Sequence, residues 1–102
     1  MSSTMGYEFA YEDEARAAAA DLDRRFTREE LAGLRIYRVR WNGNFLVEAA
    51  FSSRTPETRL KDASALLGES GTPVHPDDLA DYKQATAEGT SLPDWLRRFF
   101  GG

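Results

Sequence analysis

Two runs of alternating apolar residues, joined through Asn42-Gly43, constrain the fold of this chain more than any other feature. Together they cover residues 34–52, LRIYRVRWNGNFLVEAAFS. Asn and Gly tolerate the positive φ that tight turns demand, so an Asn-Gly pair between alternating runs is typical of a β-hairpin. The sequence therefore predicts an antiparallel sheet built around this hairpin.

The length of the hairpin loop decides which side chains share a face. A two-residue loop, Asn42-Gly43, pairs odd positions with even ones and places Arg38 and Arg40 on the face of Phe45. A three-residue loop, with Gly43 in the left-handed bulge position, restores matching parity, and we predict this loop. The buried face then holds Tyr37, Val39, Phe45, Val47, Ala49 and Phe51. The opposite face holds Arg38, Arg40, Asn44, Leu46 and Glu48.

A strand and a helix are predicted before the hairpin. Residues 6–11 alternate, which predicts a short strand with Tyr7, Phe9 and Tyr11 on one side. Residues 12–26 carry an acidic first turn and a basic last turn, both favourable for the helix dipole. The inner face of this helix is apolar at helical spacing: Ala15, Ala18, Ala19, Leu22 and Phe26. Residues 1–5 are expected to form a flexible tail.

Further helices are predicted on both sides of the hairpin. Thr27 and Glu30 have the spacing of a capping box, which predicts a short helical turn over residues 28–32 that ends at Gly33. After the hairpin, Thr55-Pro56 opens a helix. Its apolar stripe consists of Leu60, Ala63, Leu66 and Leu67, and Gly68 ends it.

The last third of the sequence predicts a linker and two more helices. Residues 71–73 are interpreted as linker, and residues 75–78 start an acidic-headed helix with Leu79, Tyr82 and Ala85 facing inward. The final element covers residues 92–100. The resulting order, β-α-β-β-α-α-α, predicts an α+β domain over residues 6–100, with a small antiparallel-rich sheet and helices packed on one face. Residues 101–102 are expected to be a frayed end.

Composition excludes several chemistries. The chain has no cysteine and a single histidine, His75, so a transition-metal site would need carboxylates alone. No apolar run approaches the roughly 20 residues that span a bilayer, and the first residues do not resemble a secretory signal. We therefore expect a cytoplasmic protein without membrane contact, cofactor, metal or enzymatic activity.

Charge is distributed unevenly around the net value of −4. Residues 69–94 carry six carboxylates against Lys83, and the end of the chain concentrates bulky apolar side chains. The sequence predicts a protein-interaction or regulatory module whose partner is another protein or a second copy in a homodimer. The predicted interface residues are Asp77, Asp78, Asp81, Trp95, Leu96, Phe99 and Phe100. The C-terminal segment could alternatively dock back on its own chain and close the core.

Residues 34–54 carry four arginines against Glu48 and support a second hypothesis. An arginine-bearing sheet face could bind phosphate or stack on bases. This nucleic-acid or anion site would use Arg35, Arg38, Arg40 and Trp41. It is the less favoured hypothesis, because the parity of the strands places most aromatic residues on the core face.

Overall fold

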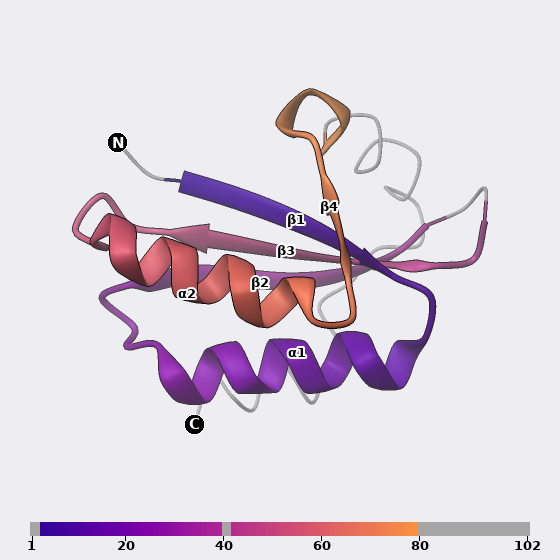
Figure 1. The fold of residues 1–102 in the computed structure, drawn as a ribbon, viewed down its shortest axis with the longest axis horizontal. Helices are drawn as coiled ribbons and strands as arrows, with labels where there is room; N and C mark the ends of the chain where they lie inside the picture. Colours follow the sequence, from indigo (N-terminus) through magenta and orange to yellow (C-terminus); the bar gives the residue numbers. More distant parts are fainter. Residues whose placement is uncertain (1–2, 40–41, 80–102) are drawn as a thin grey trace.

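The computed structural model describes residues 3–39 and 42–79. Its elements follow the order β1 (Ser3–Phe9), α1 (Glu12–Arg25), β2 (Leu31–Arg38), β3 (Phe45–Phe51), α2 (Glu57–Gly68) and β4 (Thr72–Val74) (Figure 1). The four strands form one antiparallel sheet in the order β2-β3-β1-β4. This is the split βαβ, or ferredoxin-like, arrangement. The predicted α+β class is confirmed.

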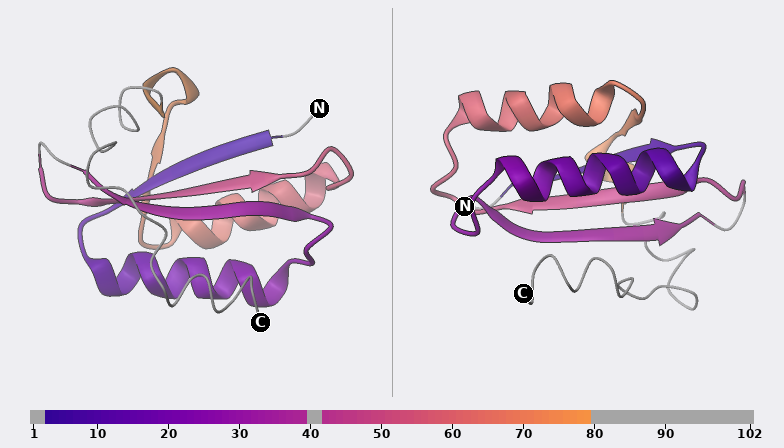
Figure 2. Two further views of the ribbon diagram at one scale, coloured as in Figure 1. Left: turned by 180° about the vertical axis from the view of Figure 1, so that it is seen from behind. Right: turned by 90° about the horizontal axis from the view of Figure 1, so that it is seen from below.

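Helices α1 and α2 both lie on one face of the sheet, which we call the helix face (Figure 2). The small residues Ala15, Ala18 and Ala19 are buried on α1, as predicted, and let that helix approach the strands closely. The sheet contributes the other half of this main core: Tyr7, Phe9, Leu31, Leu34, Ile36, Val47, Ala49 and Phe51. We call the other side of the sheet the open face.

The hairpin register differs from the predicted one. Arg38 pairs with Phe45 and Ile36 pairs with Val47, so even positions of β2 face odd positions of β3. The N–H of Val39 donates to the carbonyl of Asn44 at 2.7 Å, which leaves four residues, 40–43, between the paired positions. The three-residue loop is therefore wrong, although Gly43 does adopt the expected positive φ of 72°.

In the observed register, several side chains lie on the face of the sheet opposite to the predicted one. Tyr37 and Val39 lie on the open face, where they form a second apolar cluster with Leu46. Arg38 lies on the helix face, on the side of Phe45, because directly opposed residues share a face. The prediction that Arg38 shares a face with Leu46 and Glu48 is wrong.

The capping box forms, but it leads into a strand. The N–H of Thr27 donates to Oε1 of Glu30 at 3.0 Å, and the N–H of Glu30 donates to Oγ1 of Thr27 at 3.2 Å. The predicted helical turn over residues 28–32 is wrong, because β2 already begins at Leu31. Leu31 is buried in the main core opposite Phe51, and this burial outweighs the local helical preference.

Two boundaries near β1 and α2 differ from the sequence expectation. Strand β1 starts at Ser3, which pairs with Phe51, so the ladder includes residues expected in the tail. Tyr11 is 68% exposed at the start of α1 and does not join Tyr7 in the core. Helix α2 begins after Pro56, and the hydroxyl of Thr55 donates to the carbonyl of Glu30 at 3.0 Å.

The predicted linker after α2 is a strand. Strand β4 pairs antiparallel with β1, with Pro73 opposite Tyr7. A proline is tolerated there because β4 is an edge strand, whose outward N–H is not needed by the ladder. Helical residues 76–79 follow, as predicted for the acidic-headed helix. Tyr82, Ala85 and the element predicted over residues 92–100 lie outside the described residues.

Candidate binding groove on the open face of the sheet

A groove of about 560 Å³ lies on the open face of the sheet. Gly33 of β2 and Ala50 of β3 are paired neighbours, and their small side chains leave space above the strands. Pro76 and Leu79 contribute from the helical residues that follow β4. The full lining is Thr4, Gly33, Leu34, Arg35, Glu48, Ala50, Pro76 and Leu79.

Three polar side chains form a connected cluster at the groove. Arg35 and Glu48 are paired across β2 and β3, and both line the groove. The hydroxyl of Tyr37 donates to Oε1 of Glu48 at 3.3 Å. Hydrogen bonding to Tyr37, and then charge interaction with Tyr37, raise the pKa of Arg35 above its ordinary value. Burial lowers it by less, and the charge of Glu48 adds the smallest increase. Glu48 is only 8% exposed, and a buried carboxylate needs such partners.

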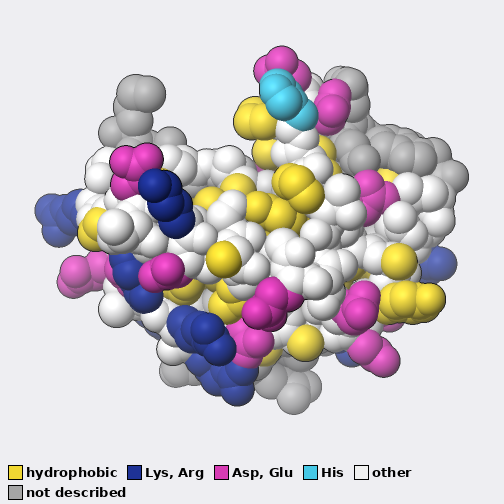
Figure 3. All heavy atoms as spheres, viewed as in Figure 1, with side chains coloured by type: hydrophobic (Ala, Val, Ile, Leu, Met, Phe, Trp, Pro, Cys, Tyr) yellow, Lys and Arg dark blue, Asp and Glu magenta, His cyan; other side chains and the backbone are white. Residues whose placement is uncertain are grey.

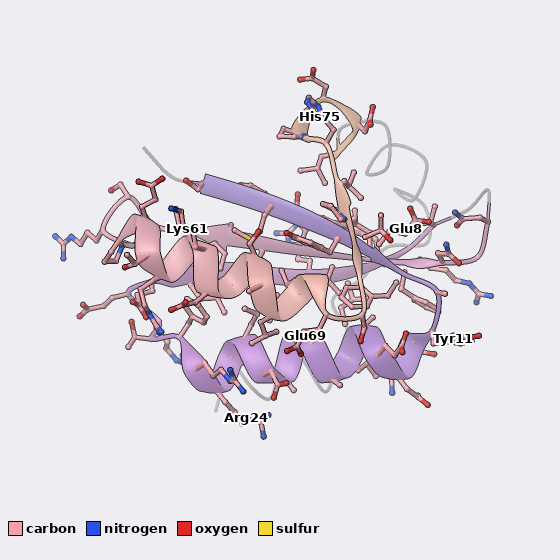
Figure 4. All side chains as sticks on the ribbon, viewed as in Figure 1. Glu8, Tyr11, Arg24, Lys61, Glu69 and His75 are labelled. Carbon is pink, nitrogen blue, oxygen red and sulfur yellow. The ribbon has the colours of Figure 1, made fainter. Side chains whose placement is uncertain are left out.

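An acidic turn stands beside the groove. His75 precedes helical residues 76–79, and its Nδ1 accepts a hydrogen bond from the N–H of Asp77 at 3.1 Å. Asp77 and Asp78 are exposed, and Figure 3 shows His75 with acidic side chains around it. The histidine thus caps the turn, and it stands apart from Glu8 and Glu69 (Figure 4). Negative charge at this rim favours a basic ligand group.

The hairpin end is fixed to β1 by a carboxylate. Oε2 of Glu8 accepts hydrogen bonds from Nδ2 of Asn42 at 2.6 Å and from Nδ2 of Asn44 at 2.7 Å. The backbone N–H of Asn44 also donates to Oδ1 of Asn42 at 2.9 Å. These contacts fix the register of the strands that carry the groove.

The arginines proposed from the sequence do not form one surface. Arg35 lies on the open face beside Glu48, whereas Arg38 lies on the helix face and is exposed. Arg40 and Trp41 lie outside the described residues. The structure thus brings Arg35 into the groove and separates it from Arg38.

The predicted interface residues are placed in part. Asp77 and Asp78 are exposed and stand in the chain between Pro76 and Leu79, which line the groove. Asp81, Trp95, Leu96, Phe99 and Phe100 lie outside the described residues. Sequence reasoning missed the groove-lining residues Thr4, Gly33, Ala50 and Pro76. A glycine inside a strand often marks a close approach by another segment, so Gly33 was the available signal.

A second hollow, of about 410 Å³, lies between α1 and α2, but its central cation is already engaged. Nε of Arg59 donates to Oε2 of Glu30 at 3.1 Å, and its guanidinium lies 4.1 Å from the centre of the Phe26 ring. Nη2 of Arg59 also donates to the carbonyl of Arg25 at 2.5 Å. Arg59 therefore ties α2 to the end of α1 and to the start of β2.

Glu30→Gln is expected to destabilise the fold at neutral pH and to have a much smaller effect near pH 2. Hydrogen bonds from Arg59, and then from the backbone of Thr27, lower the pKa of Glu30 from 4.5 to about 2. Because the folded state favours the charged carboxylate, this stabilisation is fully present above pH 4.5 and is lost as the pH falls toward 2. Urea unfolding of both proteins at several pH values measures the difference. Glu29→Gln, at an exposed neighbour, serves as the control, and a pH-independent loss in Glu30→Gln would contradict the assignment.

Comparison with known proteins gives no relative: neither a protein-family model, nor a curated protein, nor a solved structure matches this chain significantly. Within residues 3–39 and 42–79, no group of three or more histidines and carboxylates could hold a metal ion. The helices in the same part of the chain are too short or too polar to cross a membrane. The candidate site is therefore defined by its geometry alone.

Proposed function

We propose that this chain is a non-enzymatic protein-interaction module that binds an apolar segment of a basic partner in the groove on the open face. The observation that carries the proposal is the groove itself, which lies opposite the two helices. Its volume falls within the range of about 300–1,000 Å³ typical of ligand sites. Fold alone would not support this function, because many unrelated activities share this arrangement.

The side chains around the groove indicate the chemistry of the partner. Leu79 and Ala50 offer apolar contact, and Arg35 and Glu48 offer polar groups that can orient a bound segment. Asp77 and Asp78 add exposed negative charge at the rim, which would steer a basic partner by long-range attraction. An apolar segment flanked by lysine or arginine fits this combination.

Retention of a partner by tagged full-length protein tests the function, with nuclease present to remove nucleic acid. Ala50→Arg places a long charged side chain in the groove and is expected to weaken retention at least tenfold. Ala17→Arg is the matched control, because Ala17 is exposed on α1 at the other face. Both variants are first checked for an unchanged melting temperature. Equal retention by the two variants would refute the groove as the binding surface.

The contribution of the acidic rim is tested separately. Asp77→Asn combined with Asp78→Asn is expected to weaken retention and to reduce its dependence on salt. Nuclease-sensitive retention would instead favour the nucleic-acid hypothesis, with Arg35 as its remaining groove residue.

A further inference from the structure

The described part of the chain covers the open face less fully than the helix face. The helix face is covered by α1 and α2, with 14 and 12 residues. On the open face, Leu79 and Val74 complete the apolar cluster among the described residues. Beyond this cluster, the groove residues Thr4 and Arg35 are exposed, and Gly33 and Ala50 are half-buried. This part of the open face therefore has room for a further apolar segment.

The chain itself leads onto this face. Leu79 is the last described residue, and it lies directly on β1 at Gly6. A Cβ added to Gly6 would clash with Cδ2 of Leu79. Twenty-three residues follow Leu79, so the chain continues from a point that is already on the open face.

The sequence that follows contains a segment suited to such a face. Its bulky apolar residues recur at i, i+3, i+4, i+7 and i+8, the spacing of one helical stripe: Leu92, Trp95, Leu96, Phe99 and Phe100. The twelve residues 80–91 can span about 40 Å when extended, which is longer than a seven-residue strand of about 23 Å. The segment can therefore reach any part of the groove.

We infer that residues 92–100 occupy the groove on the open face of their own chain and that a partner must displace them. Attachment through a short linker gives a segment an effective concentration of about a millimolar. A second copy at micromolar concentration would compete poorly with it. The displacement by a partner rests on the proposed function, whereas the docking itself does not.

Disulfide trapping tests the docking, because the full chain contains no cysteine of its own. One cysteine replaces Ala50 in the groove, and the second replaces Leu96 or Phe99. A disulfide requires Cα atoms about 4.4–6.8 Å apart, so only a docked segment should cross-link readily. We expect an intramolecular bond, visible as a faster-migrating monomer, that forms at least tenfold faster than with the control cysteine Ala17→Cys.

Equal rates for the groove and control cysteines would overturn the inference. Cross-linked dimers would also overturn it, because they would show a second copy in the groove. Fluorescence provides a readout without cysteines: in Trp41→Phe, Trp95 is the remaining tryptophan and should emit at short wavelength. Adding Ala50→Arg should shift this emission to longer wavelength, and an unshifted spectrum would contradict the docking.

The docking and the proposed function can fail separately. Cross-linking without any partner retained by the reduced protein would refute the function and support the docking. Partner retention without cross-linking would refute the docking and support the function. If both hold, the oxidised, cross-linked protein should retain at least tenfold less partner than the reduced protein.

Discussion

Replacing Leu46 with alanine is expected to lower the free energy of unfolding by about 2–5 kcal/mol, as for other fully buried leucines. Leu46 lies in the middle of the sheet on the open face, and no part of its side chain is exposed. It packs with Tyr37, Val39 and Leu79, so truncation removes apolar contacts and leaves a cavity between them. Urea unfolding followed by circular dichroism measures the loss, provided that the slope against denaturant stays unchanged.

A matched truncation on the helix face provides the reference value for this loss of stability. Leu67 of α2 is equally buried in the main core, so Leu67→Ala and Leu46→Ala should cost similar amounts. The register predicted from the sequence places Leu46 on the face opposite the core, beside Arg38. A loss below about 0.5 kcal/mol, typical of surface substitutions, would support that register and refute a second apolar cluster.

The hairpin shows why the sequence predicts the positions of the strands better than the sheet face on which each side chain lies. Strand β2 carries apolar residues on both sides, with Leu34 and Ile36 on the helix face and Tyr37 and Val39 on the open face. Alternation therefore cannot determine the register, since either choice buries two apolar residues. The Asn-Gly signal correctly predicts the turn, but it does not decide between loops of different length.

The helices were predictable because their signals are local. The 3.6-residue spacing and the terminal charges of α1 depend on neighbours within a turn or two, and the structure places that helix where they predict it. Strand β4 carries no comparable signal. Three residues that include Pro73 form a strand because the outer edge of β1 is available, which is a tertiary contact.

The candidate groove could not be predicted for the same reason. Its space depends on Gly33 lying beside Ala50, and that pairing follows from the register and from the bulge between Leu31 and Gly33. Arg35 is the residue of the predicted anion site that lines the groove, and the structure separates it from Arg38. Glu48 lies beside it on one face only in the observed register, whereas Tyr37, two residues along the same strand, shares its face in either register.

Gly71→Ala is expected to lower the free energy of unfolding by about 1–3 kcal/mol, the usual cost of overpacking a core. A Cβ at position 71 would lie 2.7 Å from Cζ of Phe9 and 2.8 Å from the carbonyl oxygen of Leu67. Neither atom can easily move away from the added Cβ. Phe9 is fully buried, and the Leu67 carbonyl accepts the N–H of Gly71 at 3.0 Å in the turn that ends α2.

Gly68→Ala, three residues earlier, separates this clash from the general effect of replacing a glycine. A Cβ there would meet Cε2 of Tyr7 at 3.8 Å, an ordinary contact, so the variant should change stability by no more than about 0.5 kcal/mol. Gly71 also leads directly into β4, which positions the acidic turn and Pro76 at the groove. The clash should therefore speed hydrogen exchange at residues 72–74 in Gly71→Ala more than in Gly68→Ala. Equal stability and equal exchange in the two variants would show that the turn relaxes without cost, and the close packing of Gly71 against Phe9 would then not constrain β4.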